Sequence, residues 1–127
     1  MSQARNTPDI SRTASGAIVQ RRLLKLSSGE LAHCGAGERP IGPASANAAD
    51  NALASADILA NKPGTHMLVA SKDISQDAEI FSAADGKITD ADTGFSIGHA
   101  LEAATADGDE IECVADTMKD SSAGSGS

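Results

Sequence analysis

The stretch GFSIGHALEAATADGDEIECV, residues 94–114, decides the fold class of this chain. It contains an apolar run of strand length at 95–97 and a second run at 111–115 that places Ile, Cys and Ala on one face. Alternation with a period of two is typical of a β-strand that buries one face. The Asp-Gly-Asp segment at 107–109, between the two runs, has the composition of a turn. We therefore predict two short strands joined by a turn.

A similar pattern occurs about 56 residues earlier in the chain. Residues 40–50, PIGPASANAAD, align with residues 96–107, SIGHALEAATAD, when one residue is inserted. Both segments contain Ile-Gly-x-Ala, an alanine-rich step and an aspartate. The similarity predicts one domain folded from two similar β units. The alternative is a chance match between segments of an alanine-rich chain.

The apolar side chains of this chain are small. Its 127 residues include no Trp, no Tyr and only two Phe, which corresponds to one domain with a core of Ala, Ile, Leu and Val. Such a core removes little apolar area from water, at about 25 cal/mol per Å². We therefore expect a copy of the chain, in a dimer or trimer, or another protein to cover part of its apolar surface.

Charge is distributed unevenly along the chain. Residues 1–25 carry a net charge of +4, whereas residues 26–127 carry five basic and seventeen acidic side chains, a net of −12. The acidic charge repels nucleic acid and anionic membranes, and so few aromatic side chains offer no platforms for stacking bases. We expect neither nucleic acid nor a membrane as a partner. We expect the basic segment to bind an acidic protein surface. Its candidate partner-binding residues are Arg5, Arg12, Arg21, Arg22 and Lys25.

Three segments are expected along the chain. Residues 1–15 are polar and without periodicity, which predicts a flexible basic N-terminal arm. Residues 16–118 form a single β domain, and residues 119–127 are rich in Ser and Gly and predict a flexible C-terminal tail. No signal peptide and no membrane-spanning run is recognisable, so we expect synthesis in the cytoplasm. In that reducing compartment we expect both cysteines to be small, buried or half-buried apolar side chains, with a disulfide between them as the alternative.

Turn residues separate short β-compatible runs over most of the chain. Strands are predicted at 17–26, 30–34, 41–46, 66–70, 78–83 and from 87 to 89, with a turn at 84–87 and a loop at 90–94. Residues 45–60 fit both a helix with an alanine face and a strand; we favour a strand at 52–60. The predicted fold is mainly β, a small compact β-barrel or sandwich of short strands with an extended N-terminal arm.

No pattern in the chain predicts catalysis or a bound cofactor. His33, His66 and His99, with Cys34 and Cys113, contain zinc-ligand types, but their spacing fits no compact metal motif. The acidic turns at 90–92 and 107–110 lack the spacing of a calcium loop and are better explained as solvated turns. We therefore predict no catalytic, cofactor-binding or metal-binding residues.

Residues 38–114 resemble the small capsid cement, or decoration, proteins of tailed bacteriophages. The similar runs are GTHMLVAS at 64–71, DIS at 73–75, ADGKI at 84–88 and IGHALEAATADGDEIE at 97–112. The resemblance implies a compact β protein on the outside of the mature icosahedral head that joins neighbouring major capsid subunits. It implies no catalytic residues. The chain departs from the family pattern at Gln76-Asp77, where a glycine is expected, and in its basic segment 1–25, which lies outside the match.

Two classes of function follow from these observations. The first is a structural virion protein that binds the capsid exterior, as an oligomer, and stabilises the shell by bridging major capsid protein subunits. The second is a free-standing β-barrel module, either a ligand-binding domain or a small metal-dependent enzyme. The second class requires a concave pocket on which polar groups converge.

Overall fold

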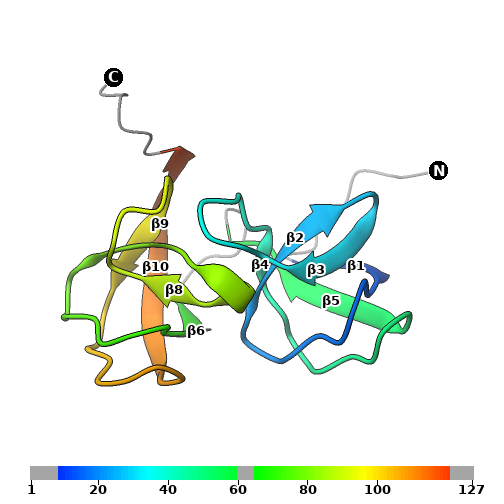
Figure 1. The fold of residues 1–127 in the computed structure, drawn as a ribbon, viewed down its shortest axis with the longest axis horizontal. Helices are drawn as coiled ribbons and strands as arrows, with labels where there is room; N and C mark the ends of the chain where they lie inside the picture. The colour runs from blue at the N-terminus through cyan, green and yellow to red at the C-terminus, as the bar shows by residue number, and fades with distance from the viewer. Residues whose placement is uncertain (1–8, 60–64, 121–127) are drawn as a thin grey trace.

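The computed structural model describes residues 9–59 and 65–120, which fold into short β-strands and one 3₁₀ turn (Figure 1). The elements are β1 (Asp9–Thr13), β2 (Leu23–Ser27), β3 (Glu30–His33), β4 (Gly42–Pro43), β5 (Leu53–Asp57), β6 (His66–Val69), β7 (Glu79–Ser82), η1 (Ala84–Gly86), β8 (Ile88–Thr89), β9 (Phe95–Ala100) and β10 (Glu110–Asp120). β1 to β5 lie on one side of the molecule and β6 to β10 on the other (Figure 1). We call residues 9–59 the N-terminal half and residues 65–120 the C-terminal half.

Each half is a small barrel-like arrangement of five strands. In the C-terminal half the strand order is β6-β10-β9-β7-β8, and a parallel bridge between Ala70 and Ile88 connects the two outer strands. In the N-terminal half, β1 pairs with β5 and β4 with β2 and β3. The bridge between Ala44 and Ala56 joins these two sheets, which gives the order β1-β5-β4-β2-β3. A parallel bridge from Ala14 to Leu31 connects its outer strands in the same way. The mainly β, compact fold predicted from the sequence is confirmed.

A unit of about 15 residues occurs four times and explains the similarity of the halves. Each unit begins at a buried alanine that ends a strand or bridge; we call these four residues, Ala14, Ala44, Ala70 and Ala100, the anchor alanines. Each anchor carbonyl accepts a hydrogen bond from a residue with a positive φ in the partner unit of the same half. These bonds run from Arg21 N to Ala44 O, Asn51 N to Ala14 O, Asp77 N to Ala100 O and Gly108 N to Ala70 O, at 2.8 or 2.9 Å. The two units of each half are therefore related by approximate two-fold symmetry.

The loops after the anchor alanines pair with each other inside each half. Ile18 and Ala48 exchange two backbone hydrogen bonds, of 2.8 and 3.0 Å, and Ile74 and Ala104 do the same at 3.0 and 2.8 Å. These isolated bridges keep residues 17–22 in a loop, so the strand predicted at 17–26 is shorter and begins only at Leu23.

Two glycines are required by close backbone packing at equivalent positions. A Cβ on Gly42 would lie 1.6 Å from the Asp57 carbonyl oxygen, and one on Gly98 would lie 1.9 Å from the Val114 carbonyl oxygen. At each site one strand crosses another with no room for a side chain. The Ile-Gly-x-Ala pattern in both segments thus reflects one packing solution used twice.

Each half has its own cluster of buried apolar side chains. The N-terminal cluster contains Leu24, Leu31 and buried alanines. The C-terminal cluster is larger and includes five isoleucines and Phe95, together with three residues of the other half, Leu23, Cys34 and Leu59. These three side chains, removed from water inside the neighbouring cluster, tie the halves together.

The chain ends of the domain differ from the sequence prediction. Residues 9–13, predicted within a flexible arm at 1–15, form β1, because each of them pairs with a residue of β5. At the other end, β10 continues to Asp120, although the flexible tail was predicted to begin at residue 119. Residues 1–8 and 121–127 lie outside the described residues. The 52–60 strand is confirmed as β5, over Leu53–Asp57.

Candidate functional site

The basic residues predicted to bind a partner are largely engaged within the chain. Arg21 Nη1 lies 2.8 Å from Glu110 Oε1 in an ion pair that joins the two halves. Arg22 Nη1 donates to the Asp85 carbonyl oxygen at 3.4 Å, and Arg12 Nη1 donates to the Ser11 carbonyl oxygen at 2.8 Å. The structure therefore assigns Arg21 and Arg22 to the contact between the halves. Arg5 lies outside the described residues.

Lys25, the last of the predicted basic residues, is held by a glutamate in the loop after β3. Its Nζ lies 2.8 Å from Glu38 Oε1, which also accepts a hydrogen bond from the Gly35 backbone at 2.7 Å. The hydrogen bonds from Lys25 and Gly35 lower the pKa of Glu38, and the bond to Glu38 raises the pKa of Lys25. This contact shapes the loop of residues 34–41, so Lys25 has a structural partner of its own.

The histidines are distributed over the molecule and do not converge. His33 Nε2 accepts a hydrogen bond from the Val19 backbone at 3.1 Å, and burial is the main cause that lowers the pKa of His33. His66 is buried at the start of β6. His99 Nδ1 contacts Asp116 Oδ2 between β9 and β10. Within residues 9–59 and 65–120, no group of three or more His, Cys, Asp or Glu side chains is arranged to hold a metal ion.

The two cysteines are buried free thiols, as the sequence predicted. Burial raises the pKa of Cys34 and of Cys113 to about 12. A thiol with such a pKa is almost fully protonated at neutral pH, and the thiolate is the reactive form. Both cysteines therefore serve as small apolar side chains of the C-terminal cluster.

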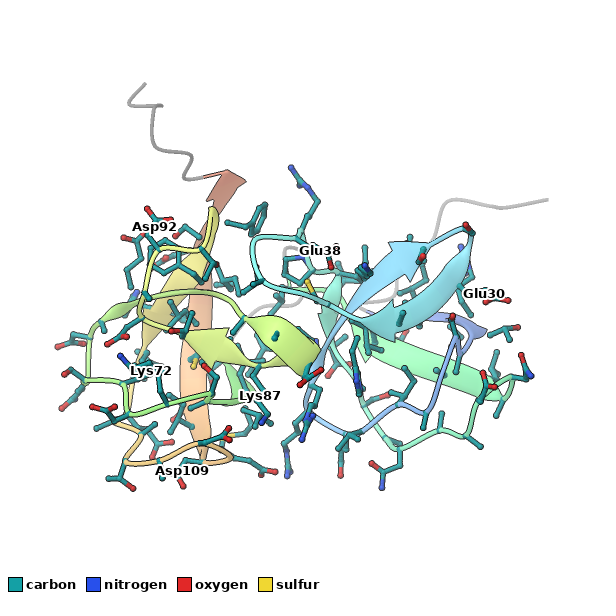
Figure 2. All side chains as sticks on the ribbon, viewed as in Figure 1. Glu30, Glu38, Lys72, Lys87, Asp92 and Asp109 are labelled. Carbon is teal, nitrogen blue, oxygen red and sulfur yellow. The ribbon has the colours of Figure 1, made fainter. Side chains whose placement is uncertain are left out.

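Asp92 and Asp109 lie in loops of the C-terminal half (Figure 2). Their carboxylates accept hydrogen bonds from the local backbone. Asp109 Oδ2 accepts hydrogen bonds from the Thr105 backbone at 2.8 Å, the Thr105 hydroxyl at 2.9 Å and the Ala106 backbone at 3.2 Å. These bonds, those of Thr105 first, lower the pKa of Asp109. Asp92 Oδ1 accepts from the Gly94 backbone at 2.9 Å in the same manner. Turn capping accounts for these side chains, as expected for aspartates in turns.

Two hollows lie at equivalent positions of the two halves. The first, of about 230 Å³, lies between the halves and is lined by Arg21, Pro43 and Asp57 on one side and by residues 65–67 on the other. The second, of about 510 Å³, lies on the C-terminal half alone. It is lined by Asp77, Glu79, Gly98, His99 and Asp116, and we call it the acidic hollow.

The two halves share an architecture but differ in charge. Residues 9–59 contain five basic and five acidic side chains, whereas residues 65–120 contain three basic and thirteen acidic ones, a net of −10. The acidic body predicted from the sequence is therefore the C-terminal half. The N-terminal half is neutral and carries three of the four large apolar side chains that are exposed in the described residues: Val19, Leu26 and Leu53.

Comparison with protein families matches residues 2–115 to the phage cement protein family. The chain belongs to this family. Among solved structures, it is similar to the head fiber gp8.5 N base of bacteriophage phi29, with a TM-score of 0.75 and 21% sequence identity. The likeness covers 87% of this chain and 95% of that one. No curated protein matches the chain. This cement protein is therefore a structural protein of a phage capsid, in agreement with the resemblance seen in the sequence.

The turn at Gln76-Asp77, where the resemblance led us to expect a glycine, has a left-handed backbone conformation at Asp77. Asp77, at the position where a glycine is expected, has a φ of 70°. Glycine adopts this left-handed conformation without strain, and aspartate is among the residues that tolerate it. Among the described residues, no helix is long and apolar enough to span a membrane.

Sequence reasoning missed the exposed apolar residues of the N-terminal half. Leu53 is 73% exposed at the start of β5, and Leu26 is 43% exposed near the end of β2. Both lie in runs predicted to be strands, where an isolated leucine is normally assigned to the core. No pattern in the sequence distinguishes these two leucines from core residues, so their exposure is evident only in the tertiary structure.

Proposed function

We propose that this cement protein binds the outer surface of the mature phage head and stabilises it by bridging major capsid protein subunits. The observation that supports the proposal most directly is the family match over residues 2–115. It also rests on the sequence expectation that so small a core needs a neighbouring protein to cover part of its surface. In this proposal the protein also associates with copies of itself, as a dimer or trimer.

Stabilisation follows from linkage. A protein that contacts two or three capsid subunits, and binds only their mature arrangement, adds its binding free energy to the stability of that arrangement. Contacts made by one molecule at several subunits reinforce each other because the later ones form at a high effective concentration. Repetition over the shell raises the resistance of the whole particle to internal pressure.

Within the predicted basic set, Arg5 and Arg12 are the first candidates for capsid contact. Arg21, Arg22 and Lys25 have partners in other segments of the chain, so their replacement would perturb the fold as well as a capsid contact. Arg12 donates only to the carbonyl oxygen of its neighbour Ser11. Arg12 lies on β1, beside the start of the described chain. In this proposal the segment of residues 1–12 pairs with carboxylates on the capsid surface.

The test uses undecorated mature heads of the corresponding phage. Purified protein is mixed with heads at increasing concentration, and both co-sedimentation and the temperature of DNA release are measured. We expect saturable binding and a higher release temperature. A well-folded protein that neither binds the heads nor raises the release temperature would exclude the cement role.

The contribution of the basic segment is tested by two variants. Deletion of residues 2–8 removes Arg5 and leaves β1 intact, and Arg12→Glu reverses the second charge. We expect both variants to bind heads more weakly, with a smaller dependence on salt concentration than the parent protein. Glu30→Gln, on β3, changes one charge elsewhere on the same half and serves as the control. Unchanged binding by both variants would remove the basic segment from the proposal.

A further inference from the structure

The two halves contact each other through different surfaces. The N-terminal half contributes Arg21, Arg22 and the loop of residues 34–41, whereas the C-terminal half contributes residues 82–86 and Glu110. Gly86 N donates to the Cys34 carbonyl oxygen at 2.7 Å, and Arg21 pairs with Glu110 at 2.8 Å. A contact between two different surfaces is heterologous, and each half therefore retains one surface of this pair that the other half does not cover.

The fourfold repeat identifies these uncovered surfaces. Equivalent anchor alanines of the two halves are 56 residues apart in the sequence. By the same interval, Arg21 in the contact surface of the N-terminal half corresponds to Asp77 on the C-terminal half. Pro43, which lines the hollow between the halves, corresponds to His99. Asp77 and His99 both line the acidic hollow. The acidic hollow is therefore the C-terminal counterpart of the surface through which the N-terminal half binds its neighbour.

The opposite shift identifies the matching surface on the N-terminal half. Ser82, opposite Ile88 in its hairpin, corresponds to Leu26, which is opposite Leu31. Glu110, opposite Val69, corresponds to Leu53, which is opposite Thr13. The turn at Asp85-Gly86 corresponds to Ser28-Gly29, and all four of these turn residues have positive φ values. We call residues 26–29 with Leu53 the leucine surface.

Solvent exposure supports this assignment independently. Ser82 is completely buried, whereas its counterpart Leu26 is 43% exposed. Leu53 is the most exposed of the large apolar side chains described, at 73%. A Cβ on Gly29 would meet nothing within 4 Å, whereas one on Gly86 would lie 2.7 Å from the Leu23 carbonyl oxygen. The surface that is covered in the C-terminal half is open in the N-terminal half, and it exposes two leucines to water there.

The contacts between the halves also indicate rotation about an axis. A Cβ on Gly37 would lie 2.5 Å from the Thr93 carbonyl oxygen, and Arg39 lies over the Phe95 ring at 5.2 Å. Each of these pairs joins residues 56 apart, which are equivalent in the two halves. Equivalent residues meet close to a rotation axis, and residues farther from it meet different partners, as Arg21 and Glu110 do. This is the pattern of neighbouring units in a ring.

From this geometry we propose that copies of the protein associate head to tail, with the leucine surface of one copy on the acidic hollow of the next. The contact repeats the one between the two halves of a single chain, so a closed ring contains an even number of halves. The inference rests on the self-association that belongs to the proposed function, and it does not depend on capsid binding.

Charge favours this arrangement over the symmetric one. Two C-terminal halves, each with a net charge of −10, repel each other if they meet. The N-terminal half is neutral over residues 9–59, so its approach to the acidic hollow carries no such cost. Inside the hollow, His99 contacts Asp116, and Glu79 accepts a hydrogen bond from the Ser96 hydroxyl at 2.5 Å. Charge therefore disfavours contact between two C-terminal halves, and the heterologous contact already present between the halves favours the head-to-tail mode.

The first test measures the mass of the full chain in solution. Sedimentation velocity and light scattering, with refractive-index detection because the chain lacks Trp and Tyr, are run over a range of concentrations. We expect an oligomer whose formation Leu26→Asp weakens by about tenfold or more. Val19→Asp is the matched control, because Val19 is 42% exposed and lies outside the leucine surface. A parent protein that stays monomeric, or equal losses in both variants, would overturn the proposal.

The second test transfers the ion pair between the halves to the contact between copies. Leu53→Glu places a carboxylate at the counterpart of Glu110 and opposite Asp77, so we expect it to abolish association. Adding Asp77→Arg creates the counterpart of Arg21 and is expected to restore association. Arg is compatible with that backbone, because Arg21 has a φ of 71° and Asp77 a φ of 70°. Failure of the double variant to associate better than Leu53→Glu alone would show that the two positions do not meet.

The outcome is separable from that of the head-binding experiment. A protein that saturates mature heads but is monomeric in solution would refute the head-to-tail contact and leave the cement role intact. The opposite result is an oligomer that Leu53→Glu abolishes and the double variant restores, formed by a protein that does not bind heads. That result would support the head-to-tail contact and exclude the cement role.

Discussion

Replacement of Gly98 by alanine tests whether close packing of β9 on β10 determines the fold of the C-terminal half. The added methyl group would lie 1.9 Å from the Val114 carbonyl oxygen, 2.8 Å from Ala115 Cα and 2.8 Å from Asp116 N. All three neighbours are backbone atoms, so no side chain can rotate away. Ordinary contact begins at 3.4 Å, so the strands must separate by roughly 1.5 Å at this point.

The size of the effect follows from what that separation breaks. Overpacking of a well-packed site costs about 1 to 3 kcal/mol. The register between β9 and β10 pairs Gly98 with Ala115 and His99 with Val114, and loss of about two hydrogen bonds there adds about 1 kcal/mol each. We expect Gly98→Ala to lower the free energy of unfolding by about 3 to 5 kcal/mol, which lowers Tm by roughly 10 to 20 °C.

Thermal and urea unfolding followed by far-UV circular dichroism measure this loss. Gly108→Ala is the control, because Gly108 has a φ of 97° and open space around its Cβ position. Its cost comes from backbone conformation alone and is about 1 to 2 kcal/mol. Gly42→Ala, at the equivalent site of the N-terminal half, should behave like Gly98→Ala. If Gly98→Ala were no more destabilising than Gly108→Ala, the packing argument would be refuted.

Three further outcomes are expected. Cys34 and Cys113 should not react with a thiol reagent in the native protein at pH 8 and should both react in denaturant, because burial raises their pKa to about 12; rapid labelling of either native thiol would contradict this. Ile74→Ala, at a side chain only 2% exposed, should lower the free energy of unfolding by about 2 to 4 kcal/mol in urea titrations, and a loss within experimental error would show that the loop packs loosely. The pKa of Glu38 is lowered in the folded protein, so its contact with Lys25 stabilises the fold at pH values above the ordinary glutamate pKa. This stabilisation is lost as pH falls through the lower pKa of the folded state. Glu38→Gln should therefore reduce the dependence of Tm on acid pH, by a small amount because the pair is exposed.

Local patterns predicted most strands of this protein because each strand buries one face. The runs at 30–34, 66–70 and 78–83 became β3, β6 and β7 with ends shifted by one residue. The ambiguous segment 45–60 was resolved as β5 by pairing with β1, a contact more than forty residues away in the chain. Residues 9–13 were assigned to a flexible arm for the same reason: their partner strand is remote, and their own composition is polar.

The candidate site was predictable only in part. The sequence identified the basic residues, but it could not show that Arg21 pairs with Glu110, 89 residues away, or that Lys25 pairs with Glu38. It detected two copies of a repeat, whereas the structure contains four. The other two could not be recognised because the four units share only a small anchor residue and one backbone conformation. The positive-φ position is occupied by four different residue types, Arg21, Asn51, Asp77 and Gly108.

The sequence by itself determined the β class, the placement of the acidic charge, the burial of both cysteines and the repeated Ile-Gly-x-Ala pattern. These properties depend on residue type and on spacing along a strand, and both can be read without knowing which segments meet. The tertiary structure alone decided that the chain forms two barrel-like halves in heterologous contact, and that this contact leaves the acidic hollow and the leucine surface uncovered. Those features arise from pairings between segments that are distant in the chain. The type of a residue does not indicate which distant residue it will contact.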